Sequence, residues 1–148
     1  LWDAGIVVVA AAGNKGPGPM TICAPGNSRK IITVGSYDAG IQKRAVRSGA
    51  GPTSACIKKP DVVAPGFHII SCSSYDARPG TAAYQLKSGT SMSTPVVSGA
   101  IALLLCRYPD MTPREVKIRL KNTCRDLHLP HEKQGWGMLD IPSLLGLS

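Results

Sequence analysis

Uninterrupted apolar runs, rather than alternating ones, dominate the first half of the chain. Residues 6–11 (IVVVAA) and 31–34 (IITV) are rich in β-branched side chains, which is typical of strands buried on both faces of a parallel sheet. Gly- and Pro-rich stretches, at residues 13–19 and 45–59, predict loops between such strands. Three shorter strand candidates follow at residues 61–63, 69–71 and 84–87. The pattern predicts a mostly parallel sheet.

The longest apolar run, residues 96–106, predicts a long helix that is buried on nearly every face. The small polar residues 88–95 lead into this helix and place Ser91 at its amino end. Free N–H groups and the helix dipole favour negative charge there. Pro109 ends the helix at Tyr108. From helix patterns alone, an N-capping serine on a core helix is the simpler interpretation of Ser91.

A second helix is predicted to begin at residue 113. Residues 112–115 (TPRE) form a capping-box sequence with Pro at the first helical position. Val116, Leu120 and Cys124 follow at four-residue spacing and would form its buried stripe. Together with the sheet, these helices predict an α/β layered fold.

Composition and charge exclude some function classes. With 43% hydrophobic and 18% charged residues the chain reads as globular, and its longest apolar run is too short to cross a bilayer. The net charge of +8 is spread along the chain and accompanied by a single Phe, which favours a solvated basic surface over nucleic-acid binding. Five cysteines without a CxxC pair argue against a disulfide framework and favour a reducing, cytoplasmic compartment.

The residues around Ser91 resemble the nucleophile segment of the subtilisin-like serine proteases (subtilases). Residues 89–100 read GTSMSTPVVSGA, where the family has Gly-Thr-Ser-Met-Ala, a small residue, Pro, often His, then Val-x-Gly. Ser93 replaces the common Ala and Val96 the common His. Further stretches resemble family signatures in the same order, at residues 7–14, 48–53, 59–66 and 135–137. Such ordered matches are far more specific than any single one.

This resemblance implies peptide-bond hydrolysis through an acyl-enzyme on Ser91, with the Asn14 amide as an oxyanion donor. Without the resemblance, Asn14 is simply a turn residue. The implied substrate pocket is lined by Gly13, Lys15, Gly89 and Thr90. Lys15 would favour an acidic side chain before the scissile bond, and its alternative is an exposed loop lysine.

The base and its orienting carboxylate are not found. Subtilases carry them upstream of the serine, in Asp-Ser/Thr-Gly and His-Gly-Thr-His motifs. The acids and histidines without the required neighbours or order are Asp3, Asp38, Asp61, His68, His128 and His131. Because the chain also starts with what reads as the last turn of a helix, closed by Gly5, we interpret residues 1–148 as the C-terminal half of a catalytic domain. We expect the isolated chain to be inactive.

Two classes of function stay open: a peptidase fragment acting on protein or peptide substrates, and a non-catalytic pseudoprotease or oligomerising binding module. The edge at residues 6–11 predicts pairing with the missing N-terminal half or with a second copy of the chain. We expect no nucleic-acid or membrane partner. We also expect no metal at Cys124, His128 and His131, since Pro130 interrupts their spacing.

The resemblance implies that the chemistry requires no cofactor. It also places a cis proline and a weak cation site at residues 24–26 (APG). A structural calcium or monovalent cation is therefore left open for this turn.

Overall fold

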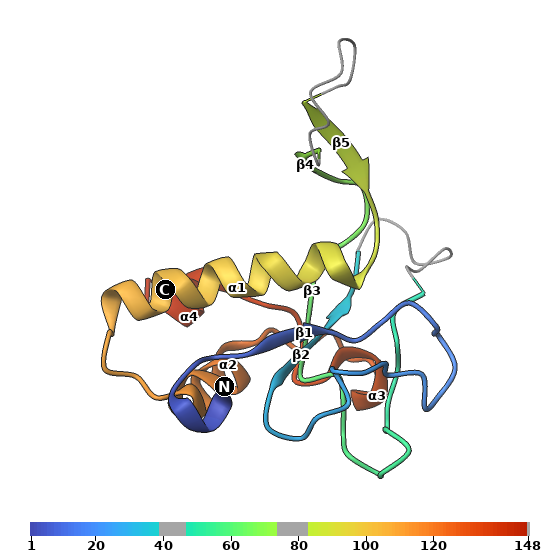
Figure 1. The fold of residues 1–148 in the computed structure, drawn as a ribbon, viewed down its shortest axis with the longest axis horizontal. Coiled ribbons are helices and arrows are strands. Elements are labelled where there is room, and N and C mark those ends of the chain that lie inside the picture. The colour runs from blue at the N-terminus through green and yellow to red at the C-terminus, as the bar shows by residue number, and fades with distance from the viewer. Residues whose placement is uncertain (39–46, 74–82, 148) are drawn as a thin grey trace.

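The computed structural model of the chain describes residues 1–38, 47–73 and 83–147. Its centre is a three-stranded parallel sheet in the order β1 (Val9–Ala11), β2 (Ile32–Ser36), β3 (Val62–Ala64). The long helix α1 (Thr90–Arg107) runs along the sheet and contacts all three strands (Figure 1). This arrangement confirms the predicted α/β fold with a parallel sheet.

The remaining elements are short. The helical ones are η1 (Trp2–Ala4), α2 (Pro113–Thr123), α3 (His131–Gln134) and α4 (Ile141–Leu145). Strands β4 (Ile69–Cys72) and β5 (Tyr84–Lys87) form a separate antiparallel ribbon that stands off from the body (Figure 1). The two last strand candidates therefore exist, but they do not belong to the parallel sheet.

One apolar cluster joins the sheet to the helices. Its fully buried side chains include Ile32, Val34 and Val62 from the strands, Val97 and Leu104 from α1, Val116 and Leu120 from α2, and Leu144 from α4. Each such side chain contributes on the order of 1.5–3 kcal/mol when it is removed from water. The two apolar stripes predicted from the sequence thus meet in a single core beside the sheet.

The first strand differs from its prediction. It is limited to β1, and its flanking residue Ile6 is 50% exposed, although residues 6–11 were expected to be buried on both faces. The reason is that β1 has a strand neighbour, β2, on one side only within the described residues. In contrast, β2 lies between two strands and is buried along its whole length.

Helix α1 also corrects an expectation. It ends at Arg107 with Tyr108 as its cap, as predicted, but only its sheet-facing side is buried, and Leu103 on the outer side is 55% exposed. With 18 residues and a mean hydropathy of 1.2, α1 is long and apolar enough to cross a membrane by length and composition, and 33% of it is buried. Its contacts with all three strands are those of a core helix.

The local predictions at chain turns are confirmed. Gly5 closes η1 in the left-handed conformation, with φ of 83°. Thr112 and Glu115 form the full capping box at the start of α2. The closing segment packs on the body, where the Trp136 N–H donates to the Asp61 carbonyl at 2.8 Å. Of the predicted loop at residues 45–59, residues 45 and 46 lie outside the described residues, and the rest contains no helix or strand.

Candidate active site

Ser91 lies in the first turn of α1, and its residue is exposed. It lines a cavity of about 480 Å³ together with β1, Thr94 and Pro25. The Ala24–Pro25 peptide bond is cis, as the resemblance predicted for this turn. The serine therefore faces an open space beside the sheet rather than the core.

Asn14 meets the start of α1, although 76 residues separate it from Thr90 in the chain. Its Oδ1 accepts the Thr90 backbone N–H at 3.1 Å and the Thr90 hydroxyl at 3.2 Å. Because the carbonyl oxygen of the amide is used in this way, the amide nitrogen is left to donate elsewhere. Asn14 is thus held next to Thr90, the residue that precedes Ser91.

Two glycines allow this approach. Gly13 has φ of +91°, and a Cβ there would come within 2.5 Å of the Cys23 Sγ. Gly89 has φ of +143°, and a Cβ there would lie 3.2 Å from the Asn14 Nδ2. A side chain at either position would therefore be strained and crowded. The Gly13 N–H donates to the Thr90 Oγ1 at 3.2 Å, which completes the link between the two segments.

The hydroxyls of Thr90 and Ser93 are buried, and sequence reasoning assigned no structural role to them. The Ser93 Oγ donates to the Ala64 carbonyl at 3.0 Å and so ties α1 to the end of β3. The spacing Thr90, Ser93, Val97 places these residues on one helix face. This spacing is the sequence signal that could have predicted their burial. The helix face that contains Thr90, Ser93 and Val97 points into the molecule, while Ser91 points away from it.

No base accompanies the serine. Among the described residues, the Ser91 hydroxyl makes no hydrogen bond and contacts no histidine. The His68 ring stacks on Phe67 at 3.8 Å between centroids, and its backbone N–H donates to the Ser88 hydroxyl. His128 is exposed and lies 3.4 Å from the Asp126 carboxylate. The described site thus holds a nucleophile and an amide donor without a partner to take the serine proton.

The buried carboxylate of Asp61 is already paired with protein cations. Asp61 is the only buried carboxylate of the described ranges, and the Thr33 N–H donates to it. It already pairs with the Lys59 ammonium at 2.5 Å and with the Lys117 ammonium at 3.3 Å. Two cations therefore share one carboxylate, and no negative charge remains for a metal.

The metal candidates near Cys124 and the Cys124 thiol itself do not form a reactive centre in the described part of the chain. Within the described ranges, no group of three His, Cys, Asp or Glu side chains could hold a metal ion. Burial, helped by the negative charge of Asp140, raises the pKa of the Cys124 thiol to about 12. This cysteine therefore stays protonated at neutral pH, and a thiol in that state is a poor ligand and nucleophile.

Known proteins resemble the chain in sequence. The profile of the subtilase family matches residues 2–137. The serine protease AprX of Bacillus subtilis is 46% identical over 136 residues, which cover 82% of this chain and 30% of that protein. Subtilisin DY of Bacillus licheniformis is 37% identical over 128 residues, which cover 85% of this chain and 42% of that protein. The chain therefore spans less than half the length of these relatives.

Solved structures resemble it in fold over nearly its whole length. The keratinolytic enzyme fervidolysin from Fervidobacterium pennivorans superposes with a TM-score of 0.76 at 25% identity, covering 97% of this chain and 23% of that one. The prenylagaramide maturation protease PagA gives a TM-score of 0.74 at 25% identity, covering 97% of this chain and 51% of that one. With its profile, its relatives and its fold in agreement, the chain belongs to the subtilase family of subtilisin-like serine proteases.

Proposed function

We propose that this chain is the part of a serine endopeptidase domain that supplies the nucleophile Ser91 and the oxyanion donor Asn14. The substrates are proteins or peptides, as membership of the family implies, and the reaction needs no cofactor. The observation that carries the proposal is the hydrogen bond from the Thr90 N–H to the Asn14 Oδ1, because it holds the amide one residue from the serine.

In the proposed reaction, the Ser91 oxygen attacks the scissile carbonyl carbon, and the carbonyl oxygen becomes an oxyanion. The Ser91 N–H lies in the first turn of α1 and has no acceptor within the helix, so it can donate to that oxyanion. The Asn14 amide nitrogen donates from the opposite side. The serine proton passes to a histidine base, which returns it to the leaving amine as the tetrahedral intermediate breaks its C–N bond and becomes the acyl-enzyme. Water then hydrolyses the acyl-enzyme and frees Ser91.

We propose that the base and its aspartate come from the remainder of the catalytic domain, of which residues 1–148 form the C-terminal portion. The isolated chain is then inactive. Incubation with a fluorophosphonate probe should leave Ser91 unlabelled, with Ser91→Ala as the blank. Stoichiometric labelling of the isolated chain would show that a base is present after all.

The oxyanion role of Asn14 is tested in a protein that contains the whole domain. Asn14→Leu should lower kcat by about 10²–10³-fold, the range known for subtilisin, which is a relative rather than this chain. The matched control is Asn27→Leu, an exposed asparagine outside the site, and it should keep full activity. A full-rate Asn14→Leu variant would remove the amide from the mechanism.

Lys15 is exposed and follows Asn14 directly. The other residues expected at the substrate pocket are Gly13, Gly89 and Thr90, of which Gly89 and Thr90 are buried. We propose that Lys15 selects an acidic residue before the scissile bond. Digestion of a peptide library by the complete enzyme should show this preference, and Lys15→Glu should reverse it. A wild-type preference for basic residues at that place would rule the idea out.

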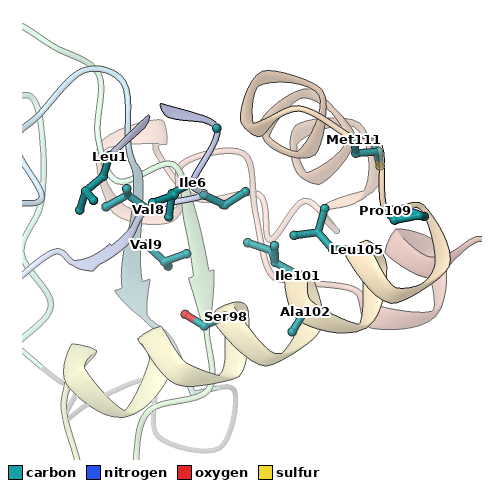
Figure 2. Close-up of a pocket in the computed structure, with 12 residues that line it drawn as sticks. Leu1, Ile6, Val8, Val9, Ser98, Ile101, Ala102, Leu105, Pro109 and Met111 are labelled. Atoms are coloured by element: carbon teal, nitrogen blue, oxygen red, sulfur yellow. The ribbon is translucent and has the colours of Figure 1, made fainter. Parts of the chain in front are cut away.

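The competing function is a non-catalytic module that assembles through β1. Figure 2 shows an apolar groove between the segment that leads into β1 and the adjacent side of α1, with Val9, Ile101 and Leu105 among its lining residues. Its volume is about 720 Å³, and the outer edge of β1 lacks a strand partner within the described ranges. In a solution of the purified chain, a second copy is the only chain available to cover this edge.

We therefore propose a homo-oligomer of the 148-residue chain through this groove. Light scattering should report a dimer or larger species, and Ala102→Glu, at an exposed position in the groove, should convert it to monomers. A wild-type monomer at high concentration would refute this assembly.

The sequence upstream of Leu1 distinguishes the peptidase from the non-catalytic module, because intact aspartate and histidine motifs there would indicate a peptidase. A cytoplasmic location is also proposed, with five free cysteines in its support.

A further inference from the structure

A second pocket, remote in its lining from the serine, combines two tryptophans with a dense group of cations. It has a volume of about 340 Å³ and lies where η1 meets α2 and the closing segment. Its lining consists of Trp2, Trp136, Ile118, Arg29, Lys30, Arg114, Lys117 and Lys121. Five of these eight residues are cationic and none is acidic, so the pocket is built for a negatively charged ligand.

Two of the cations are already neutralised and serve the structure. The Lys30 ammonium pairs with the Asp3 carboxylate at 2.7 Å. The Lys117 ammonium donates to the carbonyls of Lys30 and Ile31 and pairs with Asp61. The Lys117 ammonium also lies over both tryptophan rings, 5.8 Å from each ring centroid, at a cation–π distance.

The other three cations are available. Arg29, Arg114 and Lys121 are exposed and form no ion pair with any residue that the structure describes. The neighbouring Glu115 carboxylate is directed to the Thr112 N–H and hydroxyl at the start of α2, and no ion pair joins it to Arg114 in the part of the chain that the structure describes. Their charges are therefore uncompensated around a pocket with apolar walls.

The spacing of these charges suits an extended ligand. Arg114 and Lys121 are seven residues apart on α2, with Ile118 between them on the same face. At about 1.5 Å of rise per residue, they are separated by roughly 10 Å along the helix axis. Carboxylates two to four residues apart in an extended peptide span about 7–13 Å, which matches this separation.

The apolar lining residues of the pocket favour an acidic polypeptide over a nucleic acid as its ligand. One face of each indole is directed at the Lys117 ammonium, so the rings are not free stacking platforms for successive bases. The rest of the lining is instead formed by Ile118 and the two tryptophans, which suit aliphatic side chains. We propose that this pocket binds an extended acidic segment of a polypeptide, with carboxylates on Arg29, Arg114 and Lys121 and an apolar side chain against Trp2 and Trp136.

The two tryptophans of the pocket are the only ones in the chain, so their fluorescence reports on this site directly. The probe is a short peptide of glutamates interspersed with leucines, titrated into the 148-residue chain at low salt. We expect a saturable change in tryptophan emission whose affinity falls as salt is added. No saturable change at any salt concentration overturns the proposal.

The matched variants separate the pocket from the general basic surface. Replacing Arg29, Arg114 and Lys121 together by Gln should weaken the binding of the peptide by about eight- to a hundredfold, since each exposed pair accounts for about two- to fivefold. The control replaces Lys58, Lys87 and Lys133 by Gln, which removes the same charge from exposed positions outside the pocket. It should bind within about twofold of the wild type. Circular dichroism checks that both variants fold.

Equal losses of peptide affinity in the two triple variants would mean that binding depends only on the net charge of the chain. This result overturns the proposal. An oligothymidylate of equal charge provides the second comparison. Weaker binding than the peptide supports the proposal, whereas tighter binding that the pocket variant abolishes would assign the site to nucleic acid instead. None of these readouts requires peptidase activity, so the inference stands or falls independently of the proposed function.

Discussion

Replacing Lys59 by Met tests the buried charge cluster that fixes the β3 end of the sheet to α2. Lys59 is fully buried, and its ammonium donates to the Ile31 carbonyl at 2.8 Å and to the Asp61 carboxylate at 2.5 Å. Lys117 approaches the same carbonyl and the other carboxylate oxygen from α2. Met has nearly the same shape as the lysine stem, so the change removes mainly the charge.

The structure predicts a smaller loss for Lys59→Met than for Asp61→Asn. After Lys59→Met, Asp61 keeps the Lys117 ammonium and the Thr33 N–H, and the Ile31 carbonyl keeps its Lys117 donor. The main loss is then the charge-assisted hydrogen bond from Lys59 to Asp61, about 1.5–3 kcal/mol. After Asp61→Asn, the buried Lys59 ammonium has no counter-charge, which costs about 3–5 kcal/mol. The double variant should lose less than the sum of the two, because it leaves no buried Lys59 charge.

Urea unfolding followed by tryptophan fluorescence measures all four proteins of this cycle. Strict additivity, or a larger loss for Lys59→Met than for Asp61→Asn, would refute the reasoning. The same set has a pH test. Burial lowers the pKa of Lys59 below its usual 10.5, with Asp61 opposing the shift. The unfolded chain then binds this proton more strongly, so wild-type stability relative to Lys59→Met should rise with pH through that alkaline window.

Other expectations concern single contacts. Thr112→Ala removes the capping box of α2 and should lower the free energy of unfolding by about 1 kcal/mol, while Thr112→Ser should restore most of it in urea titrations. Ser93→Ala should destabilise by about 0.5–1.5 kcal/mol, because the Ala64 carbonyl loses the Ser93 hydroxyl and keeps only the Tyr37 N–H as a donor; an unchanged urea midpoint contradicts this contact. In thiol titration at pH 8, the three exposed cysteines should react quickly and Cys124 slowly, since burial raises its pKa to about 12. Fast reaction of Cys124 would mean that it is accessible.

Much of the fold could be predicted because its signals are local. The capping box at Thr112 and the left-handed cap at Gly5 depend on a few neighbouring residues, so the sequence specifies them directly. The run that became β2 was recognised for the same reason, since β-branched residues fit a strand wherever it lies. The serine turn was identified from its motif, and its place at the start of α1 followed.

The errors concern what covers each element. The apolar runs at β1 and α1 were interpreted as buried on all sides, yet β1 has one strand neighbour and α1 exposes Leu103. Hydrophobicity gives the capacity of a side chain to be buried, while its actual burial depends on neighbours that come from elsewhere in the chain.

Local patterns were enough to recognise most strands, the two long helices and the family motifs, because these are properties of residues close together along the chain. Which distant groups meet depends on the tertiary structure. It joined Asn14 to Thr90 across 76 positions, assembled Lys117 with Asp61, and brought Trp2 and Trp136 to one pocket. Contacts between residues so far apart in the chain depend on how the helices pack on the sheet. Local residue patterns do not specify that packing.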